Sequence, residues 1–84
     1  MKKNILVIAK NNKVEALRVA VGLVLLSDAV KVDVIGELGD SPQILEQLEV
    51  LEFADVPHEV LEDRSALIDK LAQDLIDSNA VYVI

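Results

Sequence analysis

The sequence predicts one α/β domain in which helices cover both faces of a four-stranded parallel sheet. Three observations lead to this fold class. The chain of 84 residues has the length of a single domain. Four short apolar runs alternate along it with three longer segments whose apolar residues recur at helical spacing. The first run, Asn4–Ala9, is apolar at almost every position, which is typical of a strand buried on both sides in a parallel sheet. The predicted element order is therefore βαβαβαβ.

The segment Val14–Leu26 is the first predicted helix, and only Glu15 and Arg18 are charged in it. A helix that is apolar nearly all round is buried on most of its sides. The sheet covers one side, so we expect a second cover as well. Gly22 inside this helix costs about 1 kcal/mol relative to Ala, and close packing against a strand or helix is the expected reason.

The second strand is predicted at Val30–Ile35, where apolar residues alternate with Lys31 and Asp33. Such alternation indicates a strand with one face in solvent. We therefore predict that this strand lies at an edge of the sheet.

The rest of the chain continues the same alternation. Ser41 and Pro42 are a strong helix start, because Ser caps the helix and Pro takes its first position. The remaining elements are predicted to be the helices Pro42–Ala54 and Ala66–Ile76 and the strands His58–Leu61 and Ala80–Ile84.

The expected strand order is 2-1-3-4, as in flavodoxin-like three-layer folds. In such sheets ligands bind beyond the carboxyl ends of the strands, where the strand order reverses. For this order the crevice lies between the first and third strands, flanked by the loops Lys10–Lys13 and Glu62–Ser65.

The loop after the first strand is a candidate anion site. Its two lysines precede a helix N-terminus, whose free N–H groups attract anions. The loop has no glycine, so it is no Walker or dinucleotide motif, and a capped, solvated turn is the alternative interpretation. Asn11 or Asn12 would then be the cap. The candidate anion-binding residues are Lys10, Asn11, Asn12, Lys13, Arg64 and Ser65.

Other candidate motifs favour ordinary structural roles. Gly36 and Gly39 resemble a phosphate loop, but Glu37 and Asp40 beside them repel phosphate. Glu62–Asp63 is a weak acid pair in which one residue more simply caps a helix. The sequence therefore predicts no catalytic residue, no metal site and no cofactor.

Composition limits the partners. The first 31 residues carry six basic and two acidic residues, a net charge of +4, whereas the other 53 carry two basic and thirteen acidic, a net charge of −11. An acidic chain with two aromatic residues is a poor nucleic-acid binder. Its apolar runs are too short to span a membrane, and no signal peptide is evident, so we expect a cytoplasmic protein.

The apolar content of 52% is high for so small a domain and predicts an interface. Because the sheet covers only one side of Val14–Leu26, a partner subunit is the natural second cover. We expect a homo-oligomer. Val21 and Leu25, four residues apart, are one candidate pair of interface residues.

Several stretches resemble the DsrE/DsrF/DsrH (Tus-type) sulfur-relay superfamily. They are the first strand with its loop, I-L-V-I-A-K from Ile5, the helix start E-A-L-R-V-A-V-G-L from Glu15, the second strand V-D-V-I-G from Val32, and V-L-E-D from Val60. The resemblance implies a cytoplasmic, flavodoxin-like protein that forms trimers or hexamers, alone or with paralogous subunits.

Some members of this superfamily carry a persulfide on a cysteine, and this chain has no cysteine. The sulfur-carrier role therefore transfers to no residue here. The resemblance instead implies a non-catalytic assembly or interaction protein associated with sulfur relay. A small-anion or nucleotide-binding module that uses the loop after the first strand is the alternative.

Overall fold

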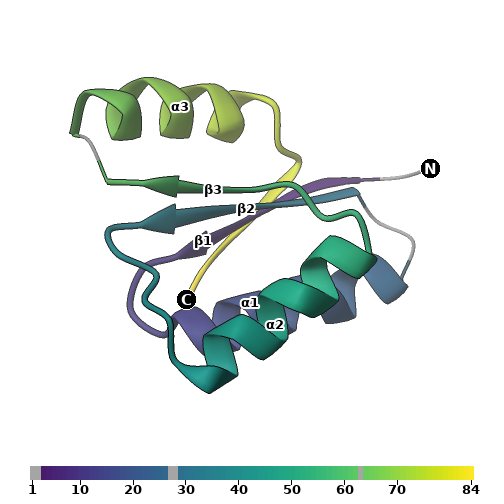
Figure 1. Cartoon of the computed structure of the whole chain (residues 1–84). Coiled ribbons are helices and arrows are strands. Elements are labelled where there is room, and N and C mark those ends of the chain that lie inside the picture. Colours follow the sequence, from purple (N-terminus) through teal and green to yellow (C-terminus); the bar gives the residue numbers. More distant parts are fainter. Residues whose placement is uncertain (1–2, 27–28, 63) are drawn as a thin grey trace.

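The computed structural model describes residues 3–26, 29–62 and 64–84. Strands and helices alternate along the chain as predicted (Figure 1). The elements are β1 (Asn4–Ala9), α1 (Lys13–Leu25), β2 (Ala29–Ile35), α2 (Pro42–Phe53), β3 (His58–Leu61), α3 (Arg64–Ile76) and β4 (Ala80–Val83). The predicted fold class, a three-layer α/β domain with a four-stranded parallel sheet, is confirmed.

The predicted strand order is wrong. The strands are ordered β3-β2-β1-β4, so β2 is an inner strand and β3 and β4 are the edges. The polar residues of β2 suggested an edge, but they point toward α3, which covers them. A strand whose polar and apolar residues alternate, as is typical of an edge strand, can thus lie inside the sheet when polar residues of a helix cover its polar face.

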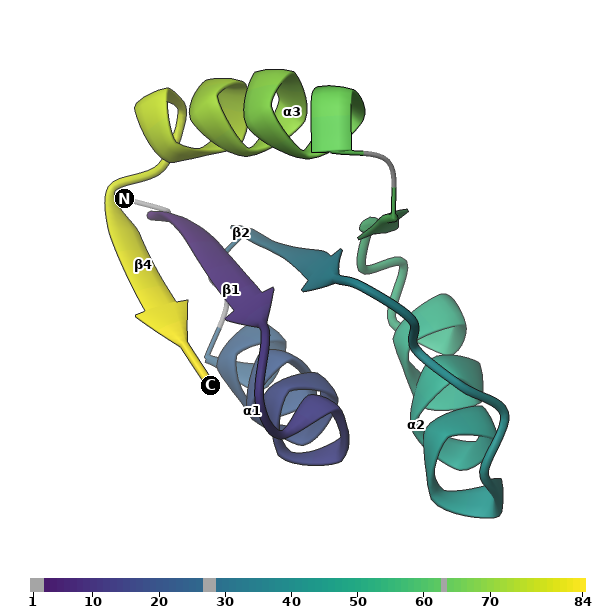
Figure 2. The same cartoon turned by 90° about the vertical axis from the view of Figure 1, so that its left-hand side faces the viewer.

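The helices lie in two layers. α1 and α2 cover one face of the sheet and α3 covers the other (Figures 1 and 2). Alternate residues of β1 and β2 point toward α1 and α2 and form the main hydrophobic core. This core includes Ile5, Val7, Ala9, Val30, Val32, Val34, Ala16, Leu17, Ala20, Ile44 and Leu51.

The second cover of α1 comes in large part from α2, which packs beside it on the same face of the sheet. Ala16, Leu17 and Ala20 are buried between them and the sheet. Toward the C-terminal end of α1, Leu23 and Val24 pack partly against this core, whereas Leu25 is 80% exposed.

Local signals at the helix starts are confirmed. The Asn12 side chain accepts a hydrogen bond from the Glu15 N–H at 3.2 Å, and Ser41 Oγ accepts one from the Ile44 N–H at 3.3 Å. The expectation for Gly22 is wrong, because a Cβ built at this position meets no atom within 4 Å. Gly22 faces open space.

No helix in the described part of the chain combines the length and the apolar character needed to cross a membrane.

Candidate functional site

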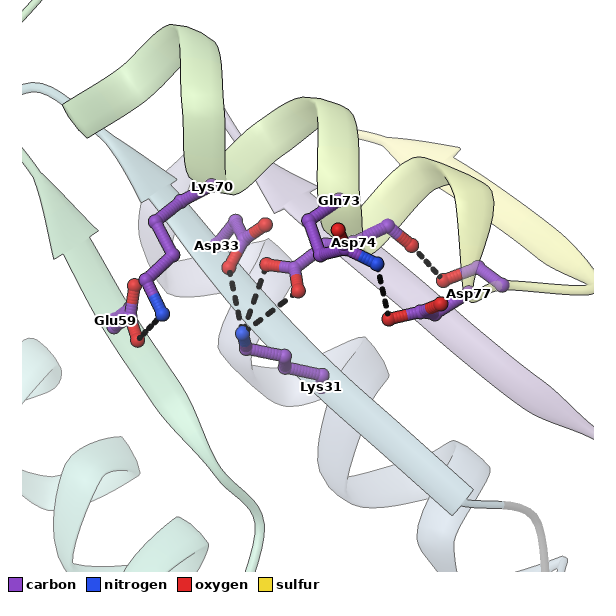
Figure 3. A network of polar contacts seen from close by, with 8 residues as sticks. Lys31, Asp33, Glu59, Lys70, Gln73, Asp74 and Asp77 are labelled. Atoms are coloured by element: carbon purple, nitrogen blue, oxygen red, sulfur yellow. Dashed lines mark hydrogen bonds and ion pairs between the residues drawn. The ribbon is translucent and has the colours of Figure 1, made fainter. Parts of the chain in front are cut away.

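Charged side chains meet between β2 and α3 (Figure 3). Lys31 and Asp33 lie two residues apart on β2, so they share one face of the sheet. Opposite them is Asp74 of α3. It follows Leu67 and Leu71 at a spacing of four and then three residues, which places it on the stripe of the helix that faces the sheet. A carboxylate thus occupies an inward position where an apolar residue is usual.

One ammonium group serves two carboxyl groups. Lys31 Nζ donates to Asp74 Oδ1 at 2.9 Å and to Oδ2 at 2.8 Å. The same nitrogen is 3.9 Å from Asp33 Oδ1. The short, paired contacts bind Lys31 to Asp74, whereas its contact with Asp33 is longer than a hydrogen bond.

Asp33 is completely buried, with 0% of its surface exposed. Neither of its carboxyl oxygens has a hydrogen-bond partner. Burial of the charged form raises the pKa of Asp33 to about 7, and the neighbouring Asp74 adds to this shift. The attraction of Lys31 acts in the opposite direction but is weaker.

The pKa of Asp74 moves the other way. Burial alone would raise it, but the interaction with the neighbouring Asp33 carboxyl group and the hydrogen bonds from Lys31 outweigh burial and hold the pKa of Asp74 below its ordinary value. For Lys31, burial favours the neutral amine, but the hydrogen bond to Asp74 and the nearby carboxylates raise its pKa. The two carboxyl groups therefore differ: Asp74 is the ionised partner of Lys31, and Asp33 is the group that holds a proton. A protonated Asp33 can donate that proton in a hydrogen bond to Asp74.

Further polar contacts surround this cluster. Lys70 of α3 lies 3.7 Å from Glu59 of β3. Ser78 Oγ donates to the backbone oxygen of Asp74 at 2.6 Å. A cavity of about 200 Å³ adjoins the cluster and is lined by Asn4, Ile5, Ala29, Val30, Lys31, Asp74, Asp77 and Ser78.

The chemistry open to this cluster is proton binding. Asp33 has a pKa suited to a general acid or base near neutral pH, but its complete burial keeps it from contact with a substrate. Within the described ranges, no group of three or more His, Cys, Asp or Glu side chains is placed to hold a metal ion. Sequence reasoning missed this site. The available signal was Asp74, a charge in the apolar pattern of a helix, together with two charges on one face of a strand.

The predicted anion-binding loop lies at the carboxyl end of β1. Three of its backbone N–H groups are already bonded. Those of Lys10 and Asn11 each donate to the Ile84 backbone oxygen at 2.9 Å, and that of Asn12 does so at 3.5 Å. The strand order reverses between β1 and β4, and a ligand is expected at such a point. Here the Ile84 backbone oxygen occupies the N–H groups that would otherwise bind the ligand.

The structure does not bring the two predicted anion-binding loops together. Arg64 and Ser65 begin α3, after β3, whereas Lys10–Lys13 follows β1. Since β2 separates β1 from β3, the two strands lie about 10 Å apart. The Arg64 side chain and Asp63, one residue of the predicted acid pair, lie outside what the structure describes, whereas Glu62 is described and exposed.

A second cavity, of about 400 Å³, lies at the carboxyl ends of β2 and β3 and includes Gly39 of the predicted glycine turn. Its polar lining is acidic, from Glu37, Asp40 and Glu62. This arrangement repels phosphate, in agreement with the interpretation of Gly36–Gly39 as a turn.

Exposed apolar side chains occur on α3 and on the edge strand β4. In α3, Ile68 and Leu75 lie on the side of the helix opposite Lys70, which contacts β3, so they face the β4 side. In β4, Val81 and Val83 pair with Leu6 and Ile8 of β1 and share the α3 face of the sheet. The α3–β4 surface consists of Ile68, Leu75, Ile76, Val81 and Val83, of which Ile76 is 78% and Val83 59% exposed.

The two residues predicted for an interface on α1 differ in their surroundings. Val21 is partly buried and packs against the core, whereas Leu25 is exposed. Only Leu25 is therefore open to a partner.

Comparison with family models, with curated proteins and with solved structures finds no match for this chain. The resemblance to the DsrE/DsrF/DsrH superfamily accordingly stays a prediction.

Proposed function

We propose that this chain is a non-catalytic interaction module that assembles with a second copy of itself through the α3–β4 surface. One observation carries the proposal: the edge strand β4 and helix α3 both expose apolar side chains. Exposed apolar surface of this kind marks protein–protein contacts. The proposal keeps the assembly role that the DsrE-like resemblance implies and leaves out sulfur chemistry, because the chain has no cysteine.

The two edges of the sheet differ in a way that supports this choice. β3 follows Pro57 and carries Glu59, which pairs with Lys70 of α3. Charge and proline are the usual protection of an edge strand against pairing. β4 has the sequence A-V-Y-V, with neither charge nor proline. Its outward N–H and C=O groups are therefore suited to pair with another strand.

A symmetric dimer with one two-fold axis would bury both the open edge of β4 and the exposed apolar residues of α3. Antiparallel pairing of β4 with β4 of the partner extends the sheet to eight strands and closes the contact between identical surfaces. The axis runs perpendicular to the sheet, so both copies of α3 lie on the same face with their apolar sides toward each other. The chain carries a net charge of −7, but none of the five residues of the α3–β4 surface is charged.

Size also favours a contact that includes α3. A stable interface takes about 800 Å² from each partner, more than the edge of a four-residue strand provides. The exposed side of α3 enlarges it.

Sedimentation velocity over a dilution series tests the proposal. We expect wild type to sediment at twice 9.2 kDa and Val83→Lys, which places a charge on the β4 edge, to sediment as a folded monomer. Leu25→Lys is the matched control on α1 and should keep the wild-type mass. A monomer at every concentration would overturn the proposal, as would a dimer that Leu25→Lys breaks and Val83→Lys does not.

A further inference from the structure

The attachment of α3 to the sheet depends on an unusual contact. Asp74 is the one buried residue among the α3 side chains that the structure describes, while Leu67 and Leu71 are half-buried and Ile68 is 61% exposed. Helices of α/β domains normally dock through an apolar stripe. Here the α3 face of the sheet includes the buried apolar residues Leu6 and Ile8, and the contact of Asp74 with Lys31 adds a polar link to the same docking surface.

The charges at this contact do not balance when both carboxyl groups are ionised. Lys31 is the one cation within 4 Å of Asp33 or Asp74 among the described ion pairs, and it is closer to Asp74. An ionised Asp33 would then be a buried anion without a hydrogen bond, beside a second anion. Such a group is strongly unfavourable.

A single proton removes this conflict. When Asp33 is protonated, its charge disappears and its O–H can donate to the Asp74 carboxylate. This agrees with the raised pKa of Asp33 and the lowered pKa of Asp74. The cluster then holds one ammonium, one carboxylate and one neutral acid, which is electrically balanced.

The other charges that face the cluster act on the same balance. Glu59 of β3 also raises the pKa of Asp33, although its own partner is Lys70. Lys70 of α3 favours the ionised form of Asp74. From β1, the residues paired with Lys31 and Asp33 are Leu6 and Ile8, which carry no charge. Lys31 therefore remains the one close cation for both acids.

We propose that the docking of α3 is controlled by one proton held between Asp33 and Asp74, so that α3 is attached most firmly in mildly acidic solution and most weakly above neutral pH. The consequence for assembly rests on the proposed function: because α3 supplies part of the α3–β4 surface, pairing of two copies should weaken over the same pH range.

The direction and range follow from the Asp33 pKa, raised to about 7 from an ordinary 3.8. The stabilisation is complete below the ordinary value and is lost as the pH rises through the raised one. The equilibrium constant for detaching α3 from the sheet should therefore increase by up to about tenfold for each pH unit between the ordinary pKa and the raised pKa of Asp33. Above the raised pKa it should increase no further.

Hydrogen exchange of the α3 amides, expressed as protection factors, measures this opening. We expect protection in wild type to fall between pH about 5 and about 7 and then to level off. Asp33→Asn keeps the shape and the donor but cannot ionise, so its α3 protection should be flat over this range. Glu46→Gln, at an exposed acid of α2, is the matched control and should behave as wild type. Flat protection in wild type, or the same fall in Asp33→Asn, would overturn the proposal.

Carbon-13 NMR of the Asp33 carboxyl group in wild type gives a measurement that needs no variant. A midpoint near 7 is expected, and one near 3.8 would contradict the proposal. In Asp74→Asn the Lys31 ammonium is no longer paired with the Asp74 carboxylate and can stabilise an ionised Asp33, so the midpoint of the Asp33 titration should fall. An unchanged or higher midpoint would count against a proton held between the two acids.

The exchange experiment separates this inference from the proposed function. If α3 protection changes with pH while the protein sediments as a monomer throughout, the proton control stands and assembly fails. If the dimer forms and α3 protection is flat, the assembly stands and the proton control fails.

Discussion

Lys31 and Asp74 are 43 residues apart in the sequence, and their side chains are joined by two hydrogen bonds of 2.9 and 2.8 Å. This pair connects the inner strand β2 to α3 across the interface of two layers. It also accounts for the alternating pattern of β2, because the polar face of the strand meets a polar residue of a helix. The loss of either partner leaves a charge in a largely buried site.

The first prediction concerns this ion pair. Lys31→Met keeps the aliphatic stem and removes the cation, so Asp74 loses both hydrogen bonds and two acids face each other. Breaking a buried pair costs about 3–5 kcal/mol, and because the Lys31 side chain is 30% exposed, we expect the lower end of that range. Urea unfolding at neutral pH measures the loss.

Lys70→Met is the matched control for Lys31→Met. Lys70 and Glu59 form an exposed pair at 3.7 Å, and such pairs contribute about 0–1 kcal/mol. Equal losses of unfolding free energy in the two variants would show that the buried position of Lys31 is unimportant.

The second prediction concerns the pH dependence of global stability. Asp33 has a raised pKa, so its stabilisation is present below 3.8 and is lost as the pH rises through about 7. Asp74 has a lowered pKa, so its stabilisation is present above 3.8 and is lost as the pH falls below that value. The cluster therefore stabilises the fold most in mildly acidic solution.

Asp33→Asn should change this profile in a defined way. The variant cannot lose a proton at this site, so at pH about 8 we expect its free energy of unfolding to exceed that of wild type by more than about 1 kcal/mol. Near pH 5 the difference should be smaller, or wild type should be the more stable of the two. Urea unfolding at both pH values gives the comparison. A constant difference between variant and wild type would contradict the titration of Asp33.

The third prediction concerns the loop after β1. The backbone N–H groups of Lys10, Asn11 and Asn12 donate to the Ile84 oxygen, so a phosphate or sulfate ion finds these three donors already occupied. We expect Lys10→Ala combined with Lys13→Ala to show the same thermal shift as wild type over a phosphate titration. A shift in wild type that saturates and is absent from the double variant would instead support the anion-binding alternative.

The order of elements was predictable because each depends on local patterns. Asn12 and Ser41 cap helices through side chains that reach three residues along the chain, and the apolar runs determine the strands. The strand order was not predictable in the same way. It depends on whether Lys31 and Asp33 face water or a helix, and that depends on Asp74, more than forty residues away.

The candidate site had the same limitation. Lys10–Lys13 attracted attention because lysine and asparagine before a helix suggest anion binding, and the sequence gives no sign that Ile84 would occupy the backbone donors. The raised pKa of Asp33 arises from burial, which a single sequence indicates only indirectly. The α3–β4 surface likewise depends on β4 being an edge strand.

The fourth prediction uses two glycines that have the same open surroundings and different backbone conformations. A Cβ added at Gly22 or at Gly39 would meet no atom within 4 Å. Gly22 lies inside α1, where glycine is less favourable than alanine by about 1 kcal/mol. We therefore expect Gly22→Ala to stabilise the protein by about that amount.

Gly39 has φ +84°, a conformation that residues with a Cβ rarely adopt. Gly39→Ala should therefore destabilise the protein, by about 1–2 kcal/mol, although it adds the same methyl group in equally open space. Because neither methyl group gains or loses a contact, the opposite signs isolate the effect of backbone conformation. Urea unfolding of both variants measures the two effects under identical conditions. A loss of stability in Gly22→Ala would mean that a partner packs closely against this side of α1, as the apolar sequence of that helix first suggested, and would favour an interface there over the α3–β4 surface.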